Sequence, residues 1–354
     1  MRASAITAAD GSIRVSYDEV SQVCMTPSLY GLLQYLLLFP EETVKRHTCY
    51  FLGYAVPRTV SDHLPAVHVD ARQTASPLAP SRWLHKLWLR ISKDWRWPFL
   101  RHAQIYALDL GFVGPLIGSR DYSLLSDGPR CMSQNMQQES VEYQRQMRKH
   151  RTLTGRLETL LYGPVATHTY GNNPQCKRFY MTEENESPVY GGRPVVVRSL
   201  QEMWNGASEG TWALVKRVFN LDEEDLSLLR SRRVIFLTQP LMLDCGLTEE
   251  ENAELLRRLV APYGEADIVF KVHPRDRFDY RRHFPHAAVY DKSVNMQLLV
   301  LLGASVQRAV TICSTAINSF PESVQADWYG PQVHSKIVQA YGTNIRPMRE
   351  YNQI

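Results

Sequence analysis

Three short segments in the second half of this sequence are almost entirely apolar, and they constrain the fold more than any other feature. They occupy residues 234–238, 268–272 and 309–313, with helical patterns at 248–261 and 295–302 between them. Strands that are apolar on both faces are typical of a parallel sheet covered by helices on both sides. The pattern therefore predicts an α/β domain built on a parallel sheet.

The first half of the chain contains a second set of such strands. Segments rich in β-branched and aromatic residues alternate with helical patterns, and they occupy residues 20–25, 48–52, 66–69, 105–108 and 122–125. A second parallel sheet is expected there. A polar stretch and an acidic run separate the two halves, so we expect domains at 1–230 and 231–354. Paired α/β domains usually bind a ligand at the carboxyl ends of their strands, in the crevice between them.

Composition and charge exclude several classes of protein. Forty Lys and Arg residues against 36 Asp and Glu give a formal net charge of +4, which is too mild to require a nucleic-acid partner. The six cysteines lie far apart without a C-x-x-C pair, which argues against a zinc site or a disulfide framework. The longest apolar run, 29–40, is too short to span a bilayer, and the N-terminus lacks a signal-like apolar region. These features indicate a cytoplasmic protein.

The end of strand 268–272 is the most informative place in the chain. Lys271 lies within this strand, and His273, Pro274 and Arg275 follow it. The ordinary pKa of an imidazole, about 6.5, lies close to working pH, so His273 can hydrogen-bond or protonate a phosphate leaving group. The alternative interpretation is a strand-end histidine in a turn made by Pro274.

Two hydroxyl residues, Ser314 and Thr315, follow strand 309–313, and a helical pattern at 315–320 begins with the second of them. Backbone N–H groups at the start of a helix attract anions. A plain helix cap is the alternative, because Ser and Thr are preferred there. Together with the histidine one strand away, these residues predict a phosphate site, to which Gln239 after strand 234–238 also belongs.

Two aspartates follow strands and are the candidates for a general base. Asp127 follows strand 122–125, and Asp244 follows strand 234–238. A carboxylate can deprotonate an acceptor hydroxyl if a desolvating environment raises its pKa. Each could equally be a turn-forming aspartate. The sequence has no D-x-D triplet to hold a cation for a nucleotide diphosphate, so we expect a reaction without metal or cofactor.

The segment 82–102 reads as a basic amphipathic helix with interfacial aromatic residues. One stripe is apolar and aromatic, and the other carries the cations Arg82, Lys86, Arg90 and Lys93. Such a helix could dock on an anionic membrane, here the inner face of a bacterial inner membrane. A helix that covers the sheet and leaves its basic face in solvent is the alternative.

Three runs resemble the C-terminal half of bacterial sialyltransferases of glycosyltransferase family 52 and of related bacterial polysialyltransferases. They are VIFLTQPLMLDCG at 234–246, IVFKVHPRDRFDY at 268–280 and AVTICSTAINSF at 309–320. The His-Pro motif of that family is similar to His273-Pro274, and its Ser-Ser/Thr motif to Ser314-Thr315. The resemblance implies a GT-B fold, in which two Rossmann-like domains with parallel sheets face a central cleft.

The resemblance also implies an activity: metal-independent, inverting transfer of sialic acid from CMP-sialic acid to lipooligosaccharide or capsule. The N-terminal domain would then be on the acceptor side, and the C-terminal domain would bind the nucleotide sugar. One departure is that Ser126-Asp127-Gly128 stands where the family has two acids before the glycine, so Asp127 and Asp244 both stay candidates for the base.

Two alternative functions and the oligomeric state remain open at the level of sequence. One is a GT-B-type transferase with another activated donor, either a glucosyl donor or a polyol phosphate. Another is a non-catalytic membrane-surface protein of polysaccharide assembly. The oligomeric state, including a homodimer, is also open.

Overall fold

The computed structural model describes residues 4–53, 55–69, 80–128, 136, 141–342 and 352–353. The chain divides into two compact units, Met1–Asn220 and Leu221–Ile354. This boundary precedes the expected one at 230 because helix α11 (Glu223–Arg230) packs against strand β12 (Ala288–Tyr290) of the second unit. Lys292 reinforces this packing, since its ammonium lies 2.6 Å from the Asp225 carboxylate.

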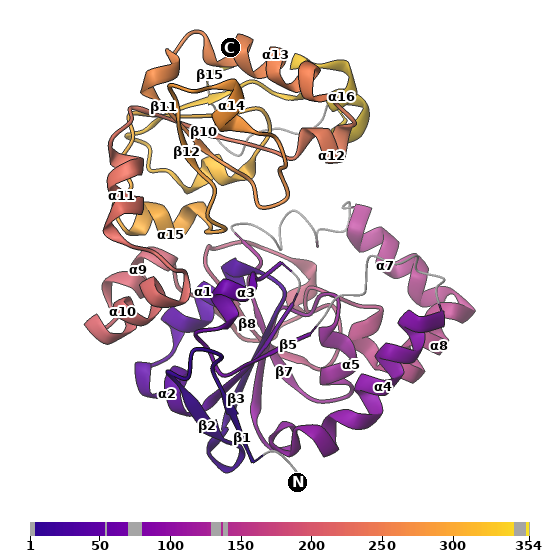
Figure 1. The fold of residues 1–354 in the computed structure, drawn as a ribbon. Coiled ribbons are helices and arrows are strands. Elements are labelled where there is room, and N and C mark those ends of the chain that lie inside the picture. Colours follow the sequence, from indigo (N-terminus) through magenta and orange to yellow (C-terminus); the bar gives the residue numbers. More distant parts are fainter. Residues whose placement is uncertain are drawn as a thin grey trace. The chain divides into compact units, whose positions relative to one another are not determined.

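The first unit is built on a seven-stranded sheet in which every neighbouring pair is parallel (Figure 1). In spatial order its strands are β5 (Ala66–His68), β4 (Thr48–Leu52), β3 (Gln22–Thr26), β6 (Gln104–Ala107), β7 (Tyr122–Leu125), β8 (Cys176–Met181) and β9 (Val195–Val197). All five predicted strands of this half are present. Strands β8 and β9 extend the sheet at one edge and were not expected from the sequence.

Helices cover this sheet, and a small antiparallel pair, β1 (Ala5–Thr7) and β2 (Arg14–Ser16), precedes it. The α-helices are α1 (Leu29–Leu38), α2 (Glu41–Arg46), α3 (Arg58–Ser61), α4 (Pro80–Arg96), α5 (Val113–Ile117), α7 (Val141–Arg151), α8 (Leu153–Tyr162), α9 (Leu200–Asn205) and α10 (Glu209–Val218). Helix α1 begins where the Ser28 hydroxyl accepts the Gly31 N–H at 3.1 Å, and it is buried along most of its length.

The second unit repeats the same plan with a six-stranded parallel sheet. In spatial order its strands are β12, β11 (Ile268–Lys271), β10 (Val234–Leu237), β13 (Arg308–Thr311), β14 (Gln325–Trp328) and β15 (Asn352–Gln353). The remaining helices are α12 (Leu241–Cys245), α13 (Glu249–Val260), α14 (Tyr280–His283), α15 (Met296–Leu301) and α16 (Ser335–Tyr341). Helix α13 begins with the predicted capping box of Thr248 and Glu251.

Both sheets reverse their strand order at one point. In each, the first strand of the sheet in chain order lies beside the fourth, which places the reversal between β3 and β6 in the first unit and between β10 and β13 in the second. Loops diverge from the carboxyl ends of the strands on either side of such a switch point, and open α/β sheets bind their ligands there. The switch point of the second sheet lies beside the predicted phosphate residues.

Helix α4 turns part of its predicted basic stripe toward the protein. Lys93 is buried, and its ammonium donates to the carbonyl oxygens of Leu116 and Ile117 at 2.7 and 3.3 Å. Burial, and then the charges of Arg120 and Arg90, lower the pKa of Lys93 to about 7. The expectation of an exposed stripe is therefore wrong at Lys93, while the side chain of Arg82 lies outside the described residues.

Neither α4 nor any other helix within the described residues is both long and apolar enough to cross a membrane. The cysteines that the structure describes, Cys24, Cys49, Cys176, Cys245 and Cys313, carry free thiols. Cys131 lies outside the described residues.

A buried carboxylate that the sequence did not single out organises the loop before β8. Asp109 accepts the N–H groups of Tyr170 and Gly171 at 2.6 and 2.7 Å and a hydrogen bond from the Tyr122 hydroxyl. Burial raises its pKa to about 6. We expect Asp109→Ala to lower the free energy of unfolding by about 3 kcal/mol, because it leaves three buried donors without an acceptor.

Urea unfolding of the purified variant measures this effect. The matched control is Asp121→Ala, which removes an exposed carboxylate 3.4 Å from the Lys177 ammonium and should change stability by less than about 0.5 kcal/mol. Equal stabilities for the two variants would contradict a structural role for Asp109.

Candidate active site

The loops after β10, β11 and β13 are tied together at the carboxyl edge of the second sheet. The His273 N–H donates to the Thr238 hydroxyl at 2.9 Å, which joins the β11 loop to the end of β10. The Cys313 N–H donates to the Gln239 side-chain oxygen at 2.9 Å, which joins the β13 loop to β10. The edge where these three loops meet is therefore held by specific hydrogen bonds.

The hydrogen bonds of His273 fix its tautomer. The Arg275 N–H donates to His273 Nδ1 at 3.1 Å, so this nitrogen must carry a lone pair. Burial, with the Arg275 and Lys271 charges as further causes, lowers the His273 pKa below its usual value. A neutral ring whose Nδ1 is an acceptor carries its proton on Nε2. His273 can therefore donate one directed hydrogen bond from Nε2.

Asp244 holds the guanidinium of Arg275. Both nitrogens of the fork lie 2.8 Å from the two carboxylate oxygens, and the Tyr341 hydroxyl donates to the same carboxylate at 3.2 Å. The hydrogen bond from Arg275 lowers the pKa of Asp244. A carboxylate that is already paired and more acidic than usual is a poor proton acceptor. The geometry therefore assigns Asp244 the orientation of Arg275 and argues against the predicted role of general base.

We expect Asp244→Asn to weaken the binding of a phosphate ligand about fivefold to tenfold, because it removes the charge that orients Arg275. The rate of the chemical step at saturating substrate should stay within about threefold, since no proton is transferred to this residue. Steady-state kinetics that separate kcat from KM check this expectation. A loss of more than about a hundredfold confined to kcat would restore Asp244 as the base.

Two further residues of the predicted phosphate site make internal contacts. The Lys271 ammonium is buried, and it donates to the carbonyl oxygens of Val272 and Lys292 at 3.2 and 3.1 Å. Burial lowers its pKa to about 8. The Gln239 side-chain oxygen accepts the N–H of Cys313. In this structure the two side chains thus support the loops around His273, which differs from their predicted role as donor-binding groups.

The segment after Ser314 differs from the expected helix. Residues Thr315–Ser319 form a short 3-10 helix, which has little macrodipole to offer an anion. The Ser314 hydroxyl accepts the Ala316 N–H at 3.4 Å, and the Ser314 N–H donates to the Thr311 hydroxyl at 3.1 Å. Thr315 is exposed. The hydroxyl groups of Ser314 and Thr315, rather than a helix end, are therefore the groups at this loop that stay candidates for binding an anion.

Asp127 in the first unit stays the candidate for the general base. It follows β7 and is partly buried, and desolvation raises its pKa to about 6 against a hydrogen bond with Ser28 that lowers it. The loop is fixed because the Ser126 N–H donates to the Gln34 side-chain oxygen at 2.8 Å. The nitrogen of the Gln34 amide donates in turn to the Tyr180 carbonyl at 3.0 Å.

Ser126 occupies the position of the first acid in the family motif and makes a local hydrogen bond. Its hydroxyl donates to the Gly128 carbonyl at 2.8 Å, so the serine shapes the turn that presents Asp127. Sequence reasoning identified Asp127 and missed its partners Ser28 and Gln34. The one available signal was the position of Ser28 as a helix cap directly after a predicted strand.

The described residues form two parallel α/β units of the kind that the GT-B fold contains. The GT-B domain of a sialyltransferase from Photobacterium damselae superposes with a TM-score of 0.53 at 12% identity, over 91% of this chain and 96% of that one. A 2,6-sialyltransferase from Photobacterium sp. JT-ISH-224, solved with CMP and lactose, gives a TM-score of 0.51 at 10% identity, over 90% and 75% of the chains. The predicted fold class is confirmed.

Residues 116–336, more than half of the chain, match the family model Glycosyltransferase family 52. The chain therefore belongs to glycosyltransferase family 52, as the three motif runs indicated. An uncharacterised protein of Haemophilus influenzae is 30% identical over 173 residues. That match covers 49% of this chain and 56% of the relative, so the matched segment spans little more than half of the relative's length.

Proposed function

We propose that this protein transfers sialic acid from CMP-sialic acid to a hydroxyl group of a cell-surface glycan, with inversion and without a metal ion. The observation that carries the proposal is the neutral His273 ring, with its proton on Nε2, beside the Asp244-bound guanidinium of Arg275. Membership of family 52 supports glycosyl transfer. The likeness to bacterial sialyltransferase folds, one of them bound to CMP, favours this donor.

In the proposed reaction the second unit binds the leaving group. CMP carries a single phosphate, so hydrogen bonds and one guanidinium can balance the charge that develops on it. His273 donates to the phosphate from Nε2, Arg275 adds its positive charge, and the Ser314 and Thr315 hydroxyls donate to the remaining oxygens. A nucleotide diphosphate would place more negative charge at the same groups.

The first unit supplies the base. Asp127 accepts the proton of the acceptor hydroxyl while the acceptor oxygen bonds to the anomeric carbon of sialic acid. The bond from that carbon to the phosphate breaks, and its electron pair leaves with CMP. Attack from the face opposite the leaving group inverts the anomeric configuration.

Calorimetric titration with CMP, UDP and CDP tests the donor assignment. We expect CMP to bind at least about tenfold more tightly than either diphosphate, which corresponds to about 1.4 kcal/mol. Tighter binding of UDP or CDP would exclude CMP-sialic acid and leave a GT-B transferase with another donor. Failure of all three to bind would favour a non-catalytic protein of polysaccharide assembly.

The acceptor and the cellular place belong to the proposal as well. We propose lipooligosaccharide or capsule as the acceptor, because both offer the hydroxyl-bearing sugars that the reaction needs, and the inner face of the bacterial inner membrane as the place of transfer. A transferase that meets such acceptors benefits from a surface that holds it at the membrane.

A further inference from the structure

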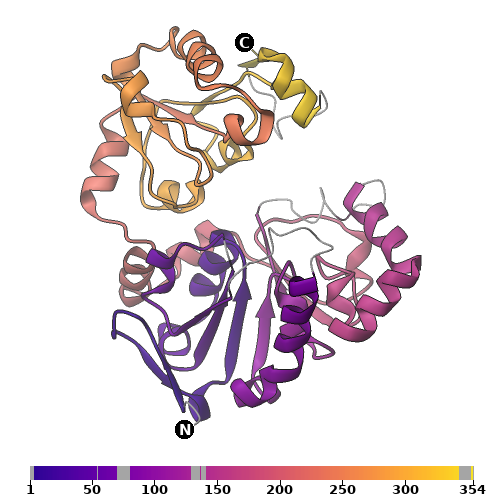
Figure 2. The ribbon, with the colours of Figure 1, turned by 45° about the vertical axis from the view of Figure 1, so that its right-hand side comes forward.

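The first unit exposes apolar side chains on two neighbouring helices. On α4 they recur at helical spacing: Leu84, Trp88, Ile91 and Trp95 are 66%, 55%, 69% and 58% exposed. On α8 they are Leu153, Leu157 and Leu160. Helices α4 and α8 contact each other and lie side by side in both views (Figure 1 and Figure 2). We call these seven side chains the apolar face.

The orientation of α4 is fixed from its opposite side. Lys93 donates to the carbonyl oxygens near the end of α5, as described above, and Leu89 is buried. Since these residues face the protein, the helix cannot bury its exposed stripe without breaking the Lys93 contacts. The apolar face is thus a stable feature of this unit.

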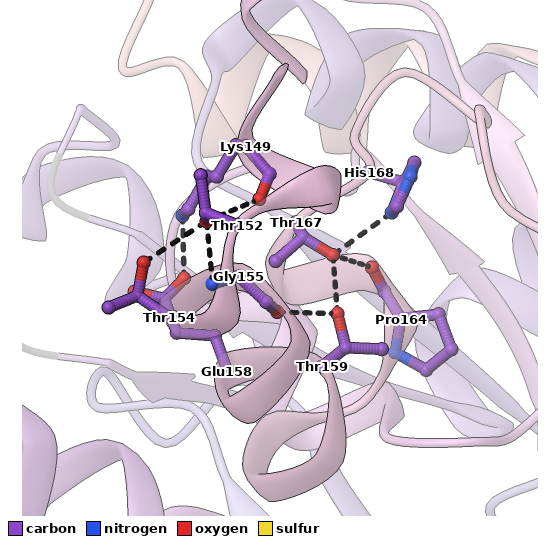
Figure 3. Close-up of polar contacts among 9 residues, drawn as sticks. All are labelled: Lys149, Thr152, Thr154, Gly155, Glu158, Thr159, Pro164, Thr167 and His168. Carbon is purple, nitrogen blue, oxygen red and sulfur yellow. Dashed lines mark hydrogen bonds and ion pairs between the residues drawn. The ribbon is translucent and has the colours of Figure 1, made fainter. Parts of the chain in front are cut away.

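Polar contacts hold α8 in the same way (Figure 3). The Thr152 hydroxyl accepts the Gly155 N–H at 3.0 Å and starts the helix. Glu158 pairs with Lys149 of α7 at 2.6 Å, and the Thr159 hydroxyl lies 2.8 Å from that of Thr167. These contacts direct Glu158 and Thr159 toward the α7–α8 hairpin and the following loop, and they leave the leucines of α8 exposed.

Exposed arginines on α7 and α8 accompany the apolar face. Arg148 and Arg151 of α7 and Arg156 of α8 are exposed. Arg156 lies three residues after Leu153 and four before Leu160, so it shares their side of the helix. The acidic residue of α8, Glu158, is already paired with Lys149. Such a surface needs a partner that offers negative charge to the arginines and an apolar interior to the exposed apolar side chains.

We propose that α4, α7 and α8 form a docking face for an anionic lipid membrane. Tryptophan is favoured at the boundary between lipid headgroups and hydrocarbon, and Trp88 and Trp95 are two of the four α4 residues in the apolar face. A second copy of the chain fits less well, because a symmetric interface would bring two surfaces of the same positive charge together. The proposal does not rest on the donor chemistry of the second unit.

Flotation with vesicles tests the apolar part of the proposal. The wild type should bind vesicles of phosphatidylcholine and phosphatidylglycerol, and Trp88→Ser with Trp95→Ser should weaken this binding by more than about tenfold. The matched control is Leu243→Ser, which removes a side chain of similar exposure, 65%, from the other unit. It should bind vesicles like the wild type.

Charge reversal tests the basic part independently. Arg148→Glu with Arg151→Glu should weaken binding to anionic vesicles by at least about thirtyfold, because each basic residue near such a surface contributes about fivefold. The control Lys216→Glu with Arg217→Glu makes the same change in net charge on the exposed side of α10, and it should have a much smaller effect.

Three results would overturn the proposal. One is the absence of vesicle binding by the wild type, and another is equal binding to pure phosphatidylcholine and to anionic vesicles. The third is a dimer in analytical ultracentrifugation that Trp88→Ser with Trp95→Ser dissociates while vesicle binding is unchanged. A thermal melt equal to that of the wild type shows that each variant is folded. The donor assignment is tested separately by CMP titration.

Discussion

Asp127→Asn is expected to lower kcat for sialyl transfer by about 10²- to 10⁴-fold, the usual contribution of a general base. The amide has nearly the same shape as the carboxylate and cannot accept the acceptor proton. Binding of CMP should be unchanged, because the proposed phosphate groups lie in the other unit. Steady-state kinetics with saturating donor and acceptor, together with a CMP titration, measure both quantities.

The pH dependence gives a second readout of Asp127. Because burial raises its pKa to about 6, activity should increase with pH through that value as the carboxylate ionises. Because the pKa of Asp127 is higher in the folded than in the unfolded state, the protonated side chain favours folding. Its contribution to the free energy of unfolding is present below about pH 4 and is lost as pH rises to about 6 and above. Asp127→Asn should thus be at least as stable as the wild type at pH 7. An Asp127→Asn variant with the kcat of the wild type would contradict the role of Asp127 as general base.

His273→Ala is expected to lower kcat/KM for the donor by about 10²- to 10³-fold, the usual effect of removing one hydrogen-bond donor from a developing anion. CMP affinity should fall by at least about tenfold, since the product phosphate uses the same Nε2 proton. His273→Gln is the matched variant, because its amide retains an N–H donor and should recover part of the binding. Unchanged CMP affinity in His273→Ala would exclude His273 from the phosphate site.

The two sheets could be predicted because their strands carry local signals. The strands at 48–52 and 122–125 have the predicted bounds, and the apolar segments at 234–238 and 268–272 each contain an observed strand. The strand expected at 309–313 is observed one to two residues earlier, at Arg308–Thr311. Strand β8 escaped prediction because its sequence, CKRFYM, mixes exposed Lys177 and Arg178 with buried residues. Its position near the sheet edge tolerates such a pattern, and the parallel register with β7 is a tertiary property.

The candidate site could be predicted only in outline, because the missing details depend on contacts between distant segments. Residues after parallel strands share one edge, which was sufficient to predict that His273 and Ser314 follow strands at the same edge, where β10 lies between β11 and β13. The pairing of Asp244 with Arg275 joins positions on α12 and after β11 that no local pattern relates. The orientation of α4 likewise depends on the hydrogen bonds from Lys93 to carbonyl oxygens of α5. The sequence of α4 alone does not determine which side of the helix faces the protein.

Direct observation of the two products tests the proposed sialyl transfer. The wild type and Asp127→Asn are incubated with CMP-sialic acid and a lactose-terminated acceptor, and both products are followed by proton NMR. We expect equal amounts of CMP and of a sialoside with inverted anomeric configuration from the wild type, and almost none of either from the variant. A sialoside with retained configuration, or consumption of a different nucleotide sugar while CMP-sialic acid stays intact, would contradict it.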